Sequence, residues 1–186
     1  MKYEYWYLNG FFNNKEIKDL TKFLEKNYDF IEEDDVRAKH GTGIDKKKTR
    51  TLVTRWNKLK EKLDHLQSYV FDINEKVFGY SINQWNNMTP VLLNIYDAKE
   101  QGEYGYHYDS SKSTVYDTKL SVLVNLSKSY EGGELWFHQG NEYPIKEFTP
   151  GTLLIFKSYI VHKVTPITKG VRKSLTIFCN GPNLVW

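Results

Sequence analysis

A histidine and an aspartate stand two positions apart in the tyrosine-rich stretch YGYHYD, residues 104–109. A β-strand turns successive side chains to opposite faces, so His107 and Asp109 would point the same way from one strand. Their Cα atoms would then lie on the order of 7 Å apart, which lets both side chains reach one object between them. Such a pair occurs often by chance, so its chemistry depends on whether a third ligand lies nearby.

A third candidate ligand, His162, follows the apolar stretch GTLLIF in the segment KSYIVHKVTP. Two imidazoles and one carboxylate on one side of a metal form the facial triad of non-haem Fe(II) sites, which leaves coordination positions free. Zinc hydrolases use the same ligand types, so a zinc site remains an alternative at this point. The three residues predict a divalent metal centre, provided that the fold brings them together.

An arginine, Arg172, stands ten positions after His162, in the segment TPITKGVRKSLTIF. We expect it at the start of the last strand, where its side chain could extend into the interior of a sheet. There the planar guanidinium could hold a carboxylate through two parallel hydrogen bonds. Most arginines lie on the surface, but this position, after a glycine and a candidate ligand, favours a binding role.

Length and composition predict one folded domain. The chain has 186 residues, of which 40% are hydrophobic and 16% aromatic, and this is too apolar for a disordered protein. Its single cysteine excludes an intrachain disulfide, and its N-terminus lacks a signal-peptide pattern, so we expect a cytoplasmic protein. We expect no membrane-spanning helix, because no run of 18 apolar residues is present. The net charge of +3 does not identify a nucleic-acid binder.

The first half of the chain has helical patterns. Residues 13–27 place apolar side chains on one face behind asparagines that are candidate caps. From Trp56 to Val77, apolar residues recur at alternating steps of three and four, which predicts a helix packed on a sheet, with a short coiled coil as the alternative. Residues 32–50 lie between these two helical patterns and are rich in charged side chains, which predicts a loop. Its basic residues 46–50 would be solvated or would contact a phosphate or acidic substrate.

The second half changes to short apolar runs separated by turn residues, which predicts strands. The runs are VLLNIY, LSVLVNL, GELWFH, GTLLIF and SLTIF. Many short strands without helices between them indicate an antiparallel double sheet of the jelly-roll type. We therefore predict an α+β fold: residues 1–186 form one domain, in which 1–89 give mainly helical support and 90–182 a jelly-roll core.

Several motifs of the second half of the chain resemble those of one protein family. Two short motifs carry the resemblance: H-x-D at His107 and Asp109, and H-x3-P-x3-G-x-R, which begins at the distant His162 and ends at Arg172. Together they resemble the Fe(II)/2-oxoglutarate-dependent dioxygenases, especially their prolyl 4-hydroxylase-like branch. Three longer segments share the resemblance in the same order: NIYDAKEQGEYGYHYD, SVLVNLSKSYEGGELWF and PGTLLIFKSYIVHKVTPITKGVR. The resemblance covers roughly residues 90–182, about half of the chain, and implies a double-stranded β-helix.

The resemblance also implies a role for each matching residue. His107, Asp109 and His162 would bind Fe(II), and Arg172 would pair with the distal carboxylate of 2-oxoglutarate. Tyr96 matches a tyrosine that hydrogen-bonds this cosubstrate in relatives, with core packing as the alternative, and Tyr104 is a weaker candidate for the same role. Dioxygen would be the oxidant, with ascorbate as a reductant. Related halogenating enzymes lack the carboxylate ligand, so Asp109 favours hydroxylation.

The resemblance alone suggests the substrate: a prolyl or other residue in a peptide or protein, with a free amino acid as an alternative. Residues 32–50 and 110–118 are candidates for the substrate rim, and Tyr108, Tyr116 and Trp136 for aromatic contacts or core packing. An oxidative nucleic-acid demethylase is the nearest rival, but Phe178 stands where that branch has a second arginine. A non-catalytic jelly-roll module that binds metal or sugar is the other alternative. Neither Asn125 nor Trp136 receives a definite role.

Overall fold

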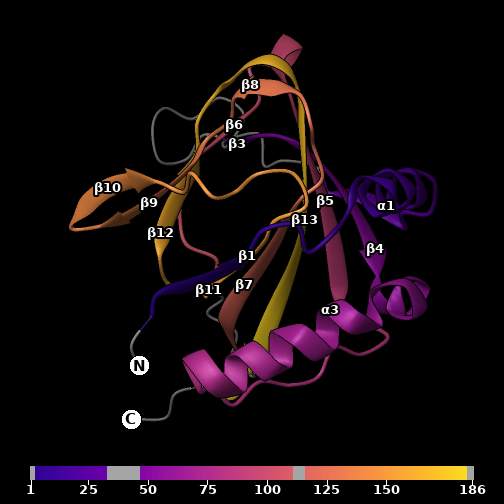
Figure 1. The fold of residues 1–186 in the computed structure, drawn as a ribbon, viewed down its shortest axis with the longest axis vertical. Helices are drawn as coiled ribbons and strands as arrows, with labels where there is room; N and C mark the ends of the chain where they lie inside the picture. Colours follow the sequence, from indigo (N-terminus) through magenta and orange to yellow (C-terminus); the bar gives the residue numbers. More distant parts are fainter. Residues whose placement is uncertain (1–2, 33–46, 111–115, 184–186) are drawn as a thin grey trace.

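The computed structural model describes residues 3–32, 47–110 and 116–183. Two antiparallel β-sheets face each other, and the helices α1 (Asn14–Lys26) and α3 (Lys60–Ile73) lie beside the larger sheet (Figure 1). Apolar side chains of both helices share one core with that sheet. The expected α+β fold, with antiparallel sheets and helices on one face, is confirmed.

The larger sheet has eight strands among the described residues, in the order β1-β11-β7-β13-β5-β4-β2, with β8 paired to β13. Its central strand, β13, is the longest and pairs with β7 on one side and β5 on the other. The bounds are β1 Tyr5–Leu8, β2 Phe30–Glu32, β4 Arg50–Arg55, β5 Pro90–Asp97, β7 Asp117–Asn125, β8 Tyr130–Gly132, β11 Leu153–Lys157 and β13 Ile167–Gly181.

The smaller sheet has five strands among the described residues, in the order β10-β9-β12-β6-β3. Strand β12 occupies its centre and pairs with β6 and β9. Neither α1 nor α3 contributes to the apolar core on the sheet's inner face, which consists of side chains from the two sheets and their connections. The bounds are β3 Lys47–Lys48, β6 Glu103–His107, β9 Leu135–Gln139, β10 Asn141–Pro144 and β12 Val161–Val164.

The strands of the larger sheet present different chemistry on their two faces, as the two-residue period of a strand requires. In β13, Leu175, Ile177 and Cys179 belong to the core shared with the helices. The alternating residues Arg172 and Ser174 line a cavity between the two sheets instead. The central strand therefore carries both the hydrophobic core and a polar internal surface.

The two helices confirm the predicted positions, with changes at their ends. The side chain of Asn13 caps α1 by accepting hydrogen bonds from the backbone N–H groups of Lys15 (2.9 Å) and Glu16 (3.1 Å), and Glu16 Oε2 accepts one from Asn13 N (2.7 Å). The pattern from Trp56 to Val77 is divided into a 3₁₀ turn, the helix α3 and a π-helical turn that ends at Gly79 (φ 69°).

The first half of the chain is less purely helical than expected. It also supplies β1, β2, β3 and β4, which extend both sheets at their edges. The predicted loop at 32–50 is wrong in its last part, because Lys47–Lys48 form β3 and Arg50 begins β4. Residues 33–46 lie outside the described residues, and the single-domain division stays a prediction.

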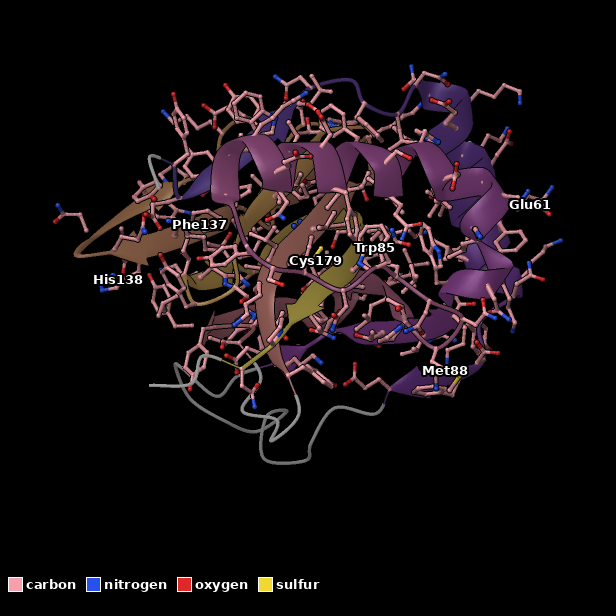
Figure 2. The ribbon with its side chains drawn as sticks, turned by 90° about the horizontal axis from the view of Figure 1, so that it is seen from below. Glu61, Trp85, Met88, Phe137, His138 and Cys179 are labelled. Atoms are coloured by element: carbon pink, nitrogen blue, oxygen red, sulfur yellow. The ribbon has the colours of Figure 1, made fainter. Side chains whose placement is uncertain are left out.

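None of the helices in the described residues is long and apolar enough to cross a membrane. Cys179 is fully buried and lies in the interior beside Trp85 (Figure 2). Burial raises the pKa of its thiol from 9.0 to about 12. At neutral pH this group is therefore protonated as well as enclosed.

We expect the thiol of Cys179 to resist iodoacetamide in the folded protein from pH 7 to pH 10, because the reactive thiolate does not form below the raised pKa. Mass spectrometry of the alkylated protein measures this directly. The same protein unfolded in guanidinium should react quickly at pH 9 and serves as the control. Rapid alkylation of the folded protein at pH 8 would contradict the buried position.

Candidate active site

The three predicted metal ligands converge at one point. His107 ends β6, and its backbone pairs in register with His162 of the neighbouring strand β12. Asp109 follows β6, where its backbone N–H donates to Ser158 O at 2.9 Å. Asp109 Oδ1 lies 3.6 Å from His107 Nε2, and Oδ2 lies 3.6 Å from His162 Nε2. One ligand atom of each residue lies within 4.8 Å of the other two.

Hydrogen bonds fix the direction in which each ligand atom points. His107 Nδ1 lies 2.8 Å from Gly105 O and His162 Nδ1 lies 2.9 Å from Ile160 O, so each Nδ1 carries the proton and donates. Both Nε2 atoms are then left with a lone pair, and they are the atoms that face Asp109. Supporting bonds of this kind are typical of metal-binding histidines.

Asp109 is held by a residue that the sequence did not suggest. Ser121, on β7 of the larger sheet, donates a hydrogen bond from its Oγ to Asp109 Oδ2 at 2.7 Å. This bond joins the two sheets at the ligand cluster and leaves Oδ1 without that constraint. Hydrogen-bonded carboxylates are the usual form of acidic metal ligands.

The electrostatics of His107 favour metal binding. The pKa of its imidazole is lowered from 6.5 to about 4, chiefly by burial and next by the neighbouring His162, while Asp109 opposes the shift. The imidazole is therefore neutral at pH 7, which is the protonation state that a metal requires. With a neutral His107, a second imidazole and one carboxylate, the cluster offers the ligand types that bind a divalent cation.

Arg172 lies buried in the larger sheet, with only 1% of its surface exposed. Its Nη1 donates to Ser174 Oγ at 3.3 Å, but neither Nε nor Nη2 has a hydrogen-bond partner among the described residues. The guanidinium lies 5.1 Å from the ring centroid of Tyr96 and 5.4 Å from that of Phe148. A buried charge with unused donors is costly, and an anion bound there would offset the cost.

The ligand cluster and Arg172 share one cavity of about 160 Å³ between the two sheets. This is room for roughly five waters at about 30 Å³ each. It is smaller than the roughly 300–1,000 Å³ typical of drug-sized ligands, so it suits a small ligand. Tyr96 and Tyr104, the two candidate cosubstrate residues, also line it.

The two tyrosines differ in what they contact. Tyr104 stacks on His107, with ring centroids 3.5 Å apart and planes 12° apart, so it packs against a candidate ligand. Tyr96 is 4% exposed and lies beside the guanidinium of Arg172. Tyr96 therefore has the better position for contact with an anion held by Arg172.

The sequence reading missed the polar residues that accompany Arg172 on the inner face of the larger sheet. Ser174 and Thr176 follow it at steps of two on β13, and Asn94 lies opposite on β5; all three line the cavity. Asn94 Nδ2 donates to Thr176 Oγ1 at 3.0 Å, and Asn94 Oδ1 accepts from Thr51 Oγ1 at 2.9 Å. The two-residue period counted from Arg172 could have identified Ser174 and Thr176.

The other aromatic candidates lie elsewhere. The expectation that Trp136 contacts substrate is not supported, because it sits on the outer face of the smaller sheet, where Lys163 Nζ lies 5.5 Å from its ring. Tyr108 and Tyr116 are exposed, whereas residues 111–115 lie outside the described part of the chain. His138 is exposed at the periphery, next to the buried Phe137 (Figure 2), and is not part of the ligand cluster.

Comparisons with known proteins agree with this geometry. Residues 91–180 match the family model described as the 2OG-Fe(II) oxygenase superfamily. A PKHD-type hydroxylase from Herminiimonas arsenicoxydans is 34% identical over 92 residues, which cover 45% of this chain and 40% of the relative. The chain thus matches less than half the length of such curated relatives.

Solved structures show the same fold over nearly the whole chain. A prolyl-4-hydroxylase from Pseudomonas putida has a TM-score of 0.72 at 15% identity, covering 98% of this chain and 95% of that chain. A prolyl hydroxylase from Trichoplax adhaerens, in complex with a peptide fragment of hypoxia inducible factor, has a TM-score of 0.66 at 16% identity, covering 96% and 84%. The sequence resemblance is therefore confirmed as a similarity: residues 91–180, just under half of the chain, match the 2OG-Fe(II) oxygenase superfamily model.

Proposed function

We propose that this chain catalyses the Fe(II)- and 2-oxoglutarate-dependent hydroxylation of a C–H bond, with dioxygen as oxidant and succinate and CO2 as products. One observation carries the proposal. A three-residue ligand cluster and a buried arginine with unused donors line the same small cavity. A metal site that binds a dianionic keto acid needs both parts, one for each end of the acid.

His107, Asp109 and His162 would hold the ferrous ion. Two neutral imidazole nitrogens and one carboxylate oxygen fit Fe(II), and they leave a net positive charge on the site as well as open coordination positions. Ser121 would keep Asp109 Oδ2 in place through its hydrogen bond. Tyr104 would limit the rotation of the His107 ring by stacking on it.

Arg172 would bind the distal carboxylate of 2-oxoglutarate. Its Nε and Nη2 atoms provide two donors, and Ser174, already bonded to Nη1, adds a hydroxyl next to them. Tyr96 encloses the guanidinium from the side of β5. Burial excludes water from this pair of charges, so the interaction between them is strengthened.

The protein's part in the reaction is positioning and exclusion of water. When bound, ferrous iron and 2-oxoglutarate supply the oxidising chemistry that hydroxylates the substrate and releases succinate and CO2. The walls of the cavity hold the two ends of the cosubstrate at fixed places, at the ligand cluster and at Arg172. Because both groups sit on paired strands, their separation is set by the sheets.

We propose a prolyl residue of a peptide or protein as the substrate, with another residue type or a free amino acid as further options. The names of similar proteins support this choice: PKHD-type hydroxylase, prolyl-4-hydroxylase, and a prolyl hydroxylase in complex with a peptide. Nucleic-acid demethylation is disfavoured, because the neutral Phe178 lines the cavity where that branch has a second arginine. A binding module without turnover gives no reason for the buried Arg172.

The first test is turnover. Reconstituted with Fe(II) under anaerobic conditions and then exposed to air, the wild type should release succinate from 2-oxoglutarate, faster with an acceptable substrate. Peptides, free amino acids and oligonucleotides should be screened for this stimulation, with mass spectrometry for a gain of one oxygen.

His107→Ala and Asp109→Ala should lower iron affinity by at least about ten-fold and reduce succinate release to background, since each removes one of three protein ligands. The matched control is His138→Ala, which removes an exposed histidine outside the cluster. Iron affinity is measured by anaerobic equilibrium dialysis. If both ligand variants bind iron like the wild type, the ligand assignment is wrong.

Arg172→Lys should raise the KM for 2-oxoglutarate by about ten-fold or more. An ammonium cannot form the bidentate pair, and each charge-assisted hydrogen bond contributes roughly 1.5–3 kcal/mol. Iron affinity should stay unchanged, because the substitution does not touch the ligand cluster. Arg55→Lys is the control, because Arg55 ends β4 with its guanidinium donating to Met88 O and does not line the cavity. An unaltered KM in Arg172→Lys would place the cosubstrate's anchor elsewhere.

A further inference from the structure

Asn125, the last residue of β7, is fully buried, although its side chain is an amide. Its Oδ1 accepts a hydrogen bond from Ser127 N at 3.0 Å. Its Nδ2 donates to Phe148 O at 2.8 Å and to the hydroxyl of Tyr130 at 3.2 Å. Both ends of the amide are thus occupied, and they join Asn125 to the residues that follow it, Ser127 and Tyr130, and to the more distant Phe148.

These partners of Asn125 lie beside the strand that carries Arg172. The backbone of Asn125 pairs with Ser174, two residues beyond the arginine. The ring of Phe148 lies 5.4 Å from the guanidinium. Tyr130 begins β8, where its backbone pairs with Gly170, two residues before the arginine. The amide of Asn125 therefore fixes the neighbours of Arg172 on both sides along β13.

Ser127, the third partner, contacts the same strand. Its Oγ donates to Lys173 O at 3.3 Å and also accepts from Lys173 N in a short hydrogen bond. Lys173 is the residue between Arg172 and Ser174, so this contact holds β13 at the point where the arginine emerges. The fit around Arg172 is close, since a Cβ added to Gly133 would lie 3.0 Å from its Cδ and 2.0 Å from Ile167 Cδ1.

If this residue served stability alone, an amide would be an unfavourable side chain for such a buried position. Burying an amide costs free energy unless all its hydrogen bonds form, and an apolar side chain of similar size avoids that cost. What an apolar side chain cannot do is attach the Phe148 carbonyl, the Tyr130 hydroxyl and the Ser127 N–H to one point. The hydrogen bonds of Asn125 therefore fix where these three groups lie relative to one another.

We propose that Asn125 is a positioning residue for Arg172. By holding Phe148 and the segment from Ser127 to Tyr130, it keeps the guanidinium where its two unused donors can receive the distal carboxylate of 2-oxoglutarate. The inference rests on the proposed function, in which Arg172 binds that carboxylate. It assigns Asn125 no contact with iron or cosubstrate, so its effect must appear through Arg172 alone.

The test compares two keto acids that differ at the end held by Arg172. 2-Oxobutyrate keeps the keto acid group of 2-oxoglutarate but lacks the distal carboxylate. Dissociation constants for both are measured anaerobically on the iron-loaded protein, from the visible absorption of the iron–keto acid complex. The wild type should prefer 2-oxoglutarate.

In Asn125→Ala, this preference should fall by about ten-fold, in the range that loss of a supporting partner usually produces. The affinities for iron and for 2-oxobutyrate should stay at their wild-type values. The matched control is Asn74→Ala: Asn74 is also a buried asparagine, with hydrogen bonds to the backbone of Tyr80, but it lies at the end of α3. Asn74→Ala should lower the thermal stability of the protein without changing its preference for 2-oxoglutarate over 2-oxobutyrate.

The outcomes separate this inference from the proposed function. A wild type that binds both keto acids equally would remove the role of Arg172 itself. If the wild type prefers 2-oxoglutarate over 2-oxobutyrate and Asn125→Ala shows the same preference, the positioning role of Asn125 is overturned. If Asn125→Ala does not fold, Phe148→Leu decides, since it removes the ring beside the guanidinium and leaves the amide in place. Unchanged preference in Phe148→Leu also overturns the inference, and a similar loss supports it.

Discussion

The active-site geometry depends on the backbone pairing of β6 with β12. This pairing places His107 directly opposite His162, although the two residues are far apart in the sequence. The N–H of Asp109 then donates to Ser158 O, so the chain beyond β6 returns its carboxylate to the two imidazoles. Because ladder hydrogen bonds fix a register, and a slip of one residue would turn each side chain to the other face, the ligand cluster exists only in this register.

The larger sheet supplies the opposite wall of the cavity, and its construction explains why the helices lie where they do. Its outer face is apolar and needs α1 and α3 to cover it. Its inner face carries Arg172, Ser174, Thr176 and Asn94, whose polar groups are joined in hydrogen-bonded pairs or left for a ligand. The face that contacts the helices builds the larger core, and the inner face carries these polar groups beside a second apolar cluster shared with the smaller sheet.

Much of this site could be predicted from the sequence, because its main residues obey local rules. The spacing of His107 and Asp109 needs only the two-residue period of a strand, and His162 and Arg172 stand beside obvious apolar runs. By contrast, β2 and β3 are short and polar or exposed, so no pattern reveals them. Ser121 and Asn125 depend on which strands become neighbours, and long-range pairing is not encoded in any local stretch.

The buried arginine distinguishes between chemistries that the metal ligands leave open. Two histidines and one aspartate would also suit zinc, and a hydrolytic site needs only a water beside the metal. Such a site has no use for a guanidinium that is 1% exposed with two donors unpaired. Burying this charge costs free energy, and an anion bound beside the guanidinium would offset that cost. Arg172 therefore favours an anionic cosubstrate as strongly as the ligand cluster favours a metal ion.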